Sequence, residues 1–232
     1  MSHLKRLTAP RRWHIARKDQ KFVIRPSPSG HQMDHVLPLL VVLRDMLHDV
    51  ETAREMKLLF KQKTVLVNGV RQTNQHASIG LLDVLSLPDV DKYYRVVISS
   101  TGRLSLLPIS KAESSKKIAR VVGKNMIMGG KVQIALQDGR TIIADNKIHV
   151  GDSVLLHLPE GKIAQVVELK KGVPIYIVNG KASGAHGRVV DFDGTEKVVY
   201  EDHQNNRRVT LKKYVVALGE DKSLIAVGGQ HE

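Results

Sequence analysis

The 232-residue chain carries 36 lysines and arginines against 23 aspartates and glutamates, so its formal net charge at pH 7 is +13. Hydrophobic residues make up 42% of the sequence, which is enough to build a packed core and excludes a wholly disordered chain. A positive excess of this size favours a phosphate-rich partner, because each lysine or arginine beside a phosphate releases condensed counterions. Solubility is the other explanation, but acidic residues usually provide it with less binding to nucleic acid.

Cysteine is absent from the sequence, which excludes disulfides and thiolate metal sites and suits a reducing cytoplasm. No apolar run approaches the roughly 20 residues that a membrane helix needs. The longest candidate, VLPLLVVL, contains Pro38 and is followed by Arg44 and Asp45. We therefore expect a soluble cytoplasmic protein with no membrane partner.

Residues 1–35 hold nearly half of the excess positive charge, because their basic residues face only Asp19 and Asp34. These basic residues are Lys5, Arg6, Arg11, Arg12, Arg17, Lys18, Lys21 and Arg25. No apolar core follows them, as a secretory signal would require, and the prolines of RPSPSG do not suit a helical transit peptide. We predict an extended basic amino-terminal arm that cannot bury itself and becomes ordered on RNA. Trp13 would either stack on a base or pack against the folded body.

A first helix is predicted within DHVLPLLVVLRDMLHD, because apolar residues recur there at helical spacing. Asp34 is the candidate N-cap, and Pro38 would lie in the first turn. The apolar positions are Leu39, Leu40, Leu43, Met46 and Leu47.

A second helix is predicted to begin at TARE, because Thr52 and Glu55 have the spacing of a capping box. It continues through the apolar residues Met56, Leu58, Leu59 and Phe60. The stretch TVLVNGVRQ then predicts a short hairpin with Asn68-Gly69 at its turn, since both residues tolerate positive φ.

The helix–helix–hairpin unit carries its own basic residues around the apolar stripe: Arg44, Arg54, Lys57, Lys61, Lys63 and Arg71. Together with the arm they form a candidate electrostatic footprint for RNA. Aromatic residues are only 4% of the chain, which argues against stacking on single strands as the main binding mode. Recognition of the shape and backbone of folded RNA fits this composition better.

From Tyr93 onward the sequence is a succession of short β runs with turn residues between them. The pairs Asp138-Gly139 and Glu160-Gly161 lie between alternating apolar runs and predict hairpins, and STG is a further turn segment between YRVVIS and RLSLLP. Only KAESSKKIARVV suggests a further helix. Short strands at regular spacing favour small barrels over a βαβ sheet.

No catalytic or metal motif is recognisable in the sequence. His31 and His35 have the i, i+4 spacing of two helical metal ligands, but no third ligand is marked, so we expect surface or RNA-facing histidines. Asp45, Asp49 and Glu51 are expected to be a solvated helix end. HExxH, GxSxG and Gly-rich phosphate loops do not occur. We therefore expect no enzyme, no metal, no cofactor and no small-molecule substrate.

Several stretches, in chain order, resemble the small-subunit ribosomal protein S4e family of archaea and eukaryotes. They are HLKRLTAP with Trp13, RPSPSGH, LPLLVVLRDML, GLLDVLSL, STGR and VNGKASGAHGRVV. The helix–helix–VNG hairpin resembles an S4-type RNA-binding domain. Gly184, Gly187 and Val189 resemble the turn of a KOW domain, which is a small SH3-like barrel. Eukaryotic members carry a basic carboxy-terminal extension, and the present sequence resembles the archaeal type instead.

The resemblance implies an α+β multidomain protein with four segments. These are a basic arm (1–35), an S4-type RNA-binding domain (36–91), a central β-rich domain (92–171) and a KOW SH3-like barrel (172–232). It also implies a structural constituent of the small ribosomal subunit that binds small-subunit rRNA beside neighbouring ribosomal proteins. Two departures are Ser29-Gly30-His31 in place of the family's GPH, and a KOW stretch less basic than many, which weakens an RNA role for Lys181 and Arg188.

Two other functions stay open on the sequence. S4-type domains also occur in RNA-modifying enzymes such as pseudouridine synthases, although the remaining chain is short for a separate catalytic domain. KOW domains also occur in transcription and translation factors that associate transiently.

Overall fold

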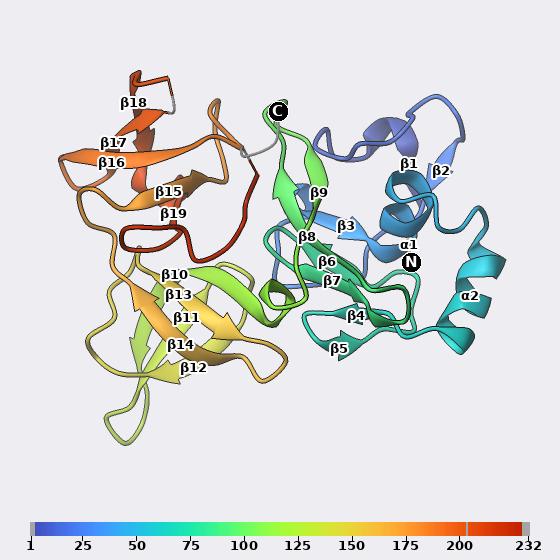
Figure 1. Cartoon of the computed structure of the whole chain (residues 1–232), viewed down its shortest axis with the longest axis horizontal. Helices are drawn as coiled ribbons and strands as arrows, with labels where there is room; N and C mark the ends of the chain where they lie inside the picture. Colours follow the sequence, from blue (N-terminus) through green and yellow to red (C-terminus); the bar gives the residue numbers. More distant parts are fainter. Residues whose placement is uncertain (1–2, 203, 229–232) are drawn as a thin grey trace. The chain divides into compact units, whose positions relative to one another are not determined.

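The computed structural model describes residues 3–202 and 204–228 (Figure 1). The chain divides into two compact units, the first formed by Met1–Val97 with Arg103–Ser115 and the second by Ile98–Gly102 with Lys116–Glu232. The structure is mostly β, with few helices and several separate sheets, so the helical content is smaller than an α+β class implies.

The first unit contains a five-stranded sheet and two two-stranded sheets. The large sheet has the order β5-β4-β7-β8-β9, and the small ones pair β1 with β2 and β3 with β6. The strands are β1 Leu4–Lys5, β2 Phe22–Val23, β3 Val36–Pro38, β4 Leu66–Val67, β5 Val70–Arg71, β6 Ser78–Gly80, β7 Val84–Leu87, β8 Lys92–Ile98 and β9 Leu104–Pro108. Short 3-10 turns lie at Arg6–Thr8, Met33–His35, Pro88–Val90 and Glu113–Ser115.

The first predicted helix exists but begins later than its sequence pattern indicates. Helix α1 spans Leu39–Val41 and continues as a π-helical turn over Val42–Met46. Its N-cap is Pro38 (φ −73°, ψ 143°), so the prediction that Asp34 caps the helix is wrong. Proline biases the preceding residue toward extended backbone, and β3 is held extended by its pairing with β6.

The second predicted helix and the following hairpin are confirmed. Helix α2 spans Ala53–Gln62, and the Thr52 side chain accepts a hydrogen bond from the Glu55 backbone N–H. Met56 and Phe60 form its buried face. The turn between β4 and β5 has φ 51° at Asn68 and 77° at Gly69, as an Asn-Gly hairpin requires.

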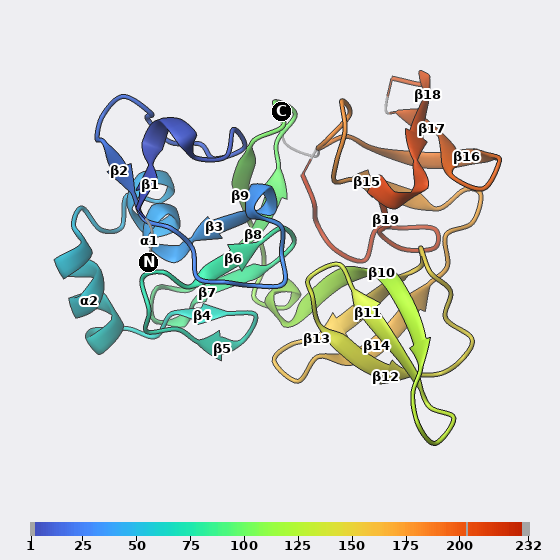
Figure 2. The ribbon, with the colours of Figure 1, turned by 180° about the vertical axis from the view of Figure 1, so that it is seen from behind.

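The second unit consists of two five-stranded antiparallel sheets (Figure 2). The first has the order β12-β11-β10-β13-β14, with β10 Lys116–Met126, β11 Val132–Leu136, β12 Thr141–Ala144, β13 Ser153–His157 and β14 Lys162–Val167. The second has the order β18-β17-β16-β15-β19, with β15 Pro174–Ile177, β16 His186–Asp193, β17 Lys197–Asp202, β18 Arg207–Leu211 and β19 Val215–Ala217. The Asp-Gly and Glu-Gly hairpins are confirmed, and the STG segment joins β8 to β9.

The helix suggested by KAESSKKIARVV is not formed. Apart from the 3-10 turn at Glu113–Ser115, this stretch is the beginning of β10, which pairs with β13 on one side and β11 on the other. Every residue from Lys117 to Val121 is buried. Burial on both faces removes the alternation that would have marked a strand in the sequence.

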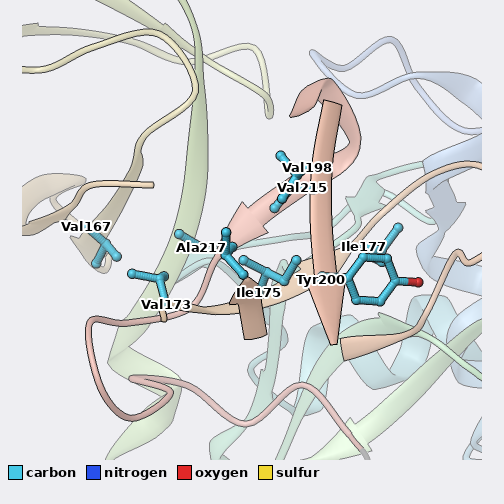
Figure 3. Packing of buried hydrophobic residues seen from close by; sticks show 9 residues of the cluster. Val167, Val173, Ile175, Ile177, Val198, Tyr200, Val215 and Ala217 are labelled. Atoms are coloured by element: carbon cyan, nitrogen blue, oxygen red, sulfur yellow. The ribbon is translucent and has the colours of Figure 1, made fainter. Parts of the chain in front are cut away.

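The core of the β15–β19 sheet is a cluster of buried aliphatic side chains around Tyr200 (Figure 3). Gly184 and Gly187 lie where the backbone leaves no room for a side chain. Gly184 has φ +91°, and the carbonyl oxygens of Ser99 and Glu201 occupy the space that a Cβ would need at Gly184 and Gly187, respectively. Both glycines are therefore required by the local packing.

Candidate nucleic-acid interface

The amino-terminal segment of the structure (residues 3–35) is folded around buried arginine and tryptophan side chains. Arg6 and Trp13 are only 1% and 2% exposed, respectively. The prediction that this segment cannot bury itself is therefore wrong, and of the two roles open to Trp13 the structure shows packing against the protein. The burial is feasible because the Arg6 guanidinium is surrounded by acceptors of this same unit.

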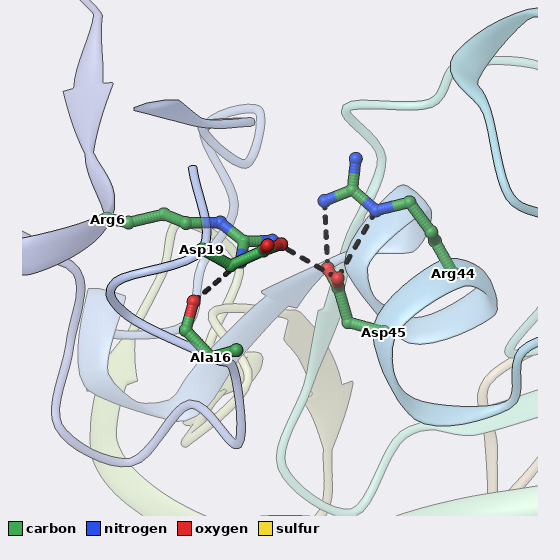
Figure 4. Close-up of polar contacts among 5 residues, drawn as sticks. All are labelled: Arg6, Ala16, Asp19, Arg44 and Asp45. Carbon is green, nitrogen blue, oxygen red and sulfur yellow. Dashed lines mark hydrogen bonds and ion pairs between the residues drawn. The ribbon is translucent and has the colours of Figure 1, made fainter. Parts of the chain in front are cut away.

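Arg6 connects the segment to the π-helical turn that follows α1 (Figure 4). Its Nη1 donates to the Ala16 carbonyl oxygen at 2.6 Å, and its Nη2 lies 3.1 Å from Asp45 Oδ1. Asp19 lies 3.5 Å from the same guanidinium, and Arg44 also pairs with Asp45 at 2.9 Å. Asp45 is therefore an ion-pair partner and not part of a solvated helix end.

These ion pairs line a cavity of about 330 Å³. Its lining consists of Arg6, Asp19, Gln20, Arg44, Asp45, His48, Val50 and Glu51. Both guanidinium groups are paired with carboxylates, and three carboxylates (Asp19, Asp45 and Glu51) line the cavity. The cavity is therefore a poor site for a phosphate, and its role is to attach the amino-terminal segment.

Arg17 and Arg12 also make contacts within the protein. The Arg17 guanidinium donates to the carbonyl oxygens of Ala9 at 2.9 Å and Pro10 at 2.8 Å, and more weakly to those of two earlier residues. Arg12 Nη1 lies 2.6 Å from His35 Nε2. Burial, and then the charge of Arg12, lower the pKa of His35 to about 4, so its imidazole is neutral at pH 7 and accepts this hydrogen bond.

The two histidines at i, i+4 spacing are not surface groups, contrary to expectation. His35 is buried, and the His31 side chain is 9% exposed, with Nε2 3.3 Å from Asp83 and its ring against Gly80. Among the described residues, no three His, Cys, Asp or Glu side chains gather as metal ligands would. The pair serves to pack the segment that precedes β3.

The remaining predicted cations are exposed on the first unit. They are Lys5, Arg11, Lys18, Lys21 and Arg25 in the amino-terminal segment, Arg54, Lys57 and Lys61 on α2, and Lys63 and Arg71 near the β4–β5 hairpin. Lys21 also lies 5.4 Å from the centre of the Phe22 ring. Arg44 is half-buried beside Asp45, as described above.

Helix α2 presents its cations as one stripe, which we call the α2 stripe (Arg54, Lys57 and Lys61). These residues lie at i, i+3 and i+7, so they share one side of the helix. Met56 and Phe60 direct the other side into the core. None of the three cations pairs with a carboxylate in the part of the chain that the structure describes, so their charge is available to an external anion.

Sequence reasoning missed a second basic group at RRVTLKKY. Arg207, Arg208, Lys212 and Lys213 occur within seven residues without an acid, and this local density was the available signal. Arg208 and Tyr200 line a cavity of about 380 Å³ in the second unit.

Sequence comparisons place this fold among ribosomal proteins. Residues 2–34 match the RS4NT (NUC023) domain, and residues 90–163 match the ribosomal family S4e. The small ribosomal subunit protein eS4 of Methanococcus vannielii is 37% identical over 238 residues, which cover 97% of each chain. The protein of the same name from Methanosphaera stadtmanae is 34% identical and covers 99% of this chain.

A solved structure supports the same assignment. The crystal structure of the 30S ribosomal protein S4e from Thermoplasma acidophilum superposes with a TM-score of 0.70 and 27% sequence identity. It covers 83% of this chain and 100% of its own. No helix of the described residues is long and apolar enough to cross a membrane. The chain belongs to the S4e (eS4) family of ribosomal proteins.

Proposed function

We propose that the chain is a structural constituent of the small ribosomal subunit, where it binds and stabilises folded small-subunit rRNA during translation. The observation that carries this proposal is the 34–37% identity, over nearly the whole chain, to proteins named small ribosomal subunit protein eS4. Its partners are small-subunit rRNA and the neighbouring ribosomal proteins, and its location is the ribosome in the cytoplasm. The family is structural, so no catalytic residue, cofactor or metal is assigned.

The α2 stripe and the exposed cations of the amino-terminal segment are the proposed rRNA contacts. A row of three unpaired cations on a rigid helix can neutralise successive phosphates without reading the bases. Arg6, Arg12, Arg17 and Trp13 are proposed to support this surface from within, since their side chains contact protein groups. The S4-type character of residues 36–91 and the KOW character of 172–232 fit the same function and remain part of the proposal.

The decisive experiment is sedimentation of ribosomes after a high-salt wash. An integral component remains with the small subunit at near-unit stoichiometry, because buried contacts with RNA are screened less than exposed ones. Release into the free pool would favour the transient KOW-type factor. Product formation in an RNA-modification assay would favour the modifying enzyme instead.

The α2 stripe is tested by the triple variant R54Q/K57Q/K61Q with rRNA. Loss of three phosphate contacts should reduce the slope of log K against log[salt] by about 2 to 3. The matched control is K162Q/K170Q/K171Q, which removes the same charge from lysines that are paired with Glu160, Glu168 and Asp191. Equal slopes of log K against log[salt] for the two triple variants would show that α2 does not contact the rRNA.

A further inference from the structure

A cavity of about 380 Å³ opens on the β15–β19 sheet of the second unit. Its wall combines the loop after β15 with the edge strand β18 and two tyrosines. The lining residues are Gly180, Lys181, Ala182, Tyr200, Arg208, Val209, Thr210, Leu211 and Tyr214. No carboxylate lines it, in contrast to the cavity beside Arg6.

Tyr200 places a buried hydroxyl group at this cavity. Its ring is completely buried among the aliphatic side chains of the sheet, and Figure 3 shows the hydroxyl oxygen at the side of the ring away from Val173 and Ala217. Within the described part of the chain the hydroxyl makes no hydrogen bond of normal geometry, although the Arg208 side chain lies close enough to act on it as a donor. An unsatisfied buried hydroxyl destabilises a protein by about 1 to 3 kcal/mol, so natural structures usually supply a partner.

The Tyr200 hydroxyl is in the protonated form that a hydrogen-bond donor requires. Burial is the largest cause and raises the pKa of Tyr200, the charge and a side-chain hydrogen bond of Arg208 lower it, and the charge of Asp202 raises it. The hydroxyl therefore keeps its proton at pH 7 and can donate it to an acceptor in the cavity.

Two cations, Arg208 and Lys181, line the same cavity as the hydroxyl. Arg208 lies directly opposite Tyr200 across the β17–β18 pair, which places their side chains on the same face of the sheet. One guanidinium nitrogen of Arg208 lies 3.5 Å from Asp202, and the side chain is 48% exposed, so further N–H donors face outward. Lys181 is exposed, with no carboxylate partner among the described residues.

We propose that this cavity is a separate RNA site that takes one backbone phosphodiester of folded RNA, with the Tyr200 hydroxyl as donor and Arg208 and Lys181 as flanking cations. The inference rests on the proposed rRNA-binding function and assigns it a second site, in the other unit of the chain. A wall with donors and positive charge but no carboxylate favours an anion with exposed oxygens. A phosphodiester has two such oxygens, and they can accept from the hydroxyl and the guanidinium together.

The geometry favours a nucleotide unit over other anions. The cavity volume lies in the lower part of the roughly 300–1,000 Å³ range of ligand sites, so it exceeds what inorganic phosphate fills. The Tyr214 ring already has Lys213 Nζ 5.3 Å from its centre, and Gly180 lies against its edge atoms. Base stacking on Tyr214 is therefore not the main contribution, and the backbone is the group that is held.

The test uses the full chain and in vitro transcribed archaeal small-subunit rRNA. The Y200F variant removes only the hydroxyl and should bind this RNA about tenfold more weakly, as expected for the loss of a hydrogen bond to a charged group. Its thermal unfolding should be unchanged or shifted upward, because a buried unpaired polar atom is removed. Inorganic phosphate at constant ionic strength should not compete with the RNA.

The variants R208Q and R207Q together measure how much the charge of Arg208 contributes to RNA binding. Both remove one positive charge from β18, but neighbouring residues of a strand face opposite sides, and Arg207 does not line the cavity. R208Q should reduce the slope of log K against log[salt] by about 1, and R207Q should reduce it less.

Three results would overturn the inference. The first is wild-type RNA affinity for Y200F together with equal slopes for R208Q and R207Q. The second is full competition by inorganic phosphate, which would assign the cavity to a small anion. The third is normal binding of the variants to naked rRNA with reduced incorporation when other ribosomal proteins are present, which would assign it to a protein partner. Absence of any binding by the wild-type chain would instead contradict the proposed function itself.

Discussion

Three arginines of the amino-terminal segment (Arg6, Arg12 and Arg17) and the three cations of helix α2 are used in opposite ways. In the segment, Arg6 and Arg17 direct their guanidinium groups toward carboxylates and backbone carbonyls of the protein. On α2, the three cations of the α2 stripe are exposed and unpaired with carboxylates of the described residues. Positive charge in a sequence therefore does not by itself locate a binding surface.

Backbone hydrogen bonding explains the difference. Within a helix the carbonyls are satisfied by the chain itself, so side-chain donors are free to face solvent. An irregular segment leaves backbone carbonyls without partners. The five N–H donors of one arginine side chain can bond several of these carbonyls at once. The three lysines of the segment, Lys5, Lys18 and Lys21, are all exposed, as expected for a more strongly hydrated ammonium group. Arg11 and Arg25 are exposed as well, so only some of the arginines of the segment are used internally.

The sharpest test of this comparison replaces one buried arginine, Arg6, and one exposed arginine, Arg54, by glutamine. R6Q leaves Asp45 with only Arg44 and removes the donor to Ala16, so the free energy of unfolding should fall by about 3 kcal/mol. R54Q should change it by less than about 0.5 kcal/mol, because Arg54 is exposed. Urea denaturation measures both. Similar losses of unfolding free energy for R6Q and R54Q would show that the buried and the exposed arginine contribute equally to stability.

A second test uses the buried partner of Arg12. The folded-state pKa of His35 is about 4, below the ordinary value of 6.5 for a histidine, so the unfolded chain binds more protons between these two values. Stability should therefore be complete above pH 6.5 and fall as the pH drops toward 4, by about 3 kcal/mol in total.

The control for His35 is the H35Q variant, which keeps an acceptor for Arg12 but does not titrate. Its stability should decrease less between pH 6.5 and pH 4 than that of the wild-type chain. Parallel pH profiles would show that the pKa of His35 is the same in the folded and the unfolded chain, and the Arg12 contact would then need another explanation.

A smaller effect is expected from R17K. Lysine keeps the charge but cannot reach the Ala9 and Pro10 carbonyls with two separate nitrogens, so about 1 to 2 kcal/mol should be lost. The converse exchange at the next residue, K18R, should be neutral, because Lys18 is exposed. An R17K variant as stable as the wild-type chain would mean that charge alone matters in this segment.

The features that could be predicted from the sequence are those decided by a few neighbouring residues. The Thr52–Glu55 cap, the Asn68-Gly69 turn and the Asp-Gly and Glu-Gly hairpins depend on local backbone preferences, and all are formed. The α2 stripe is also local, because helical period alone separates Arg54, Lys57 and Lys61 from Met56 and Phe60.

The features that were missed depend on partners far along the chain. The start of α1 is set by the pairing of Val36 with Gly80, and β10 is a strand because Lys116–Arg120 pair with β13. Arg6 is buried because Asp45, 39 residues away, accepts from it. No periodicity or cap in the sequence encodes such contacts. The cavity beside Tyr200 could not be predicted for the same reason, because its walls come from three segments that are separate in the sequence.

The smallest predicted effect concerns the element that carries the α2 stripe. The T52A variant removes the acceptor for the Glu55 N–H, which lies 3.2 Å from the Thr52 hydroxyl, and should lower the free energy of unfolding by about 1 kcal/mol. T52S keeps the hydroxyl and should restore stability, while T73A tests an exposed threonine outside any helix. Because the cap fixes the first turn, which includes Arg54, T52A should also weaken RNA binding slightly at low salt without changing the amino-terminal segment. If T52A instead matched R6Q in its loss of stability, the helix would depend on its cap as strongly as the segment depends on its buried arginine, and the contrast between the two regions would disappear.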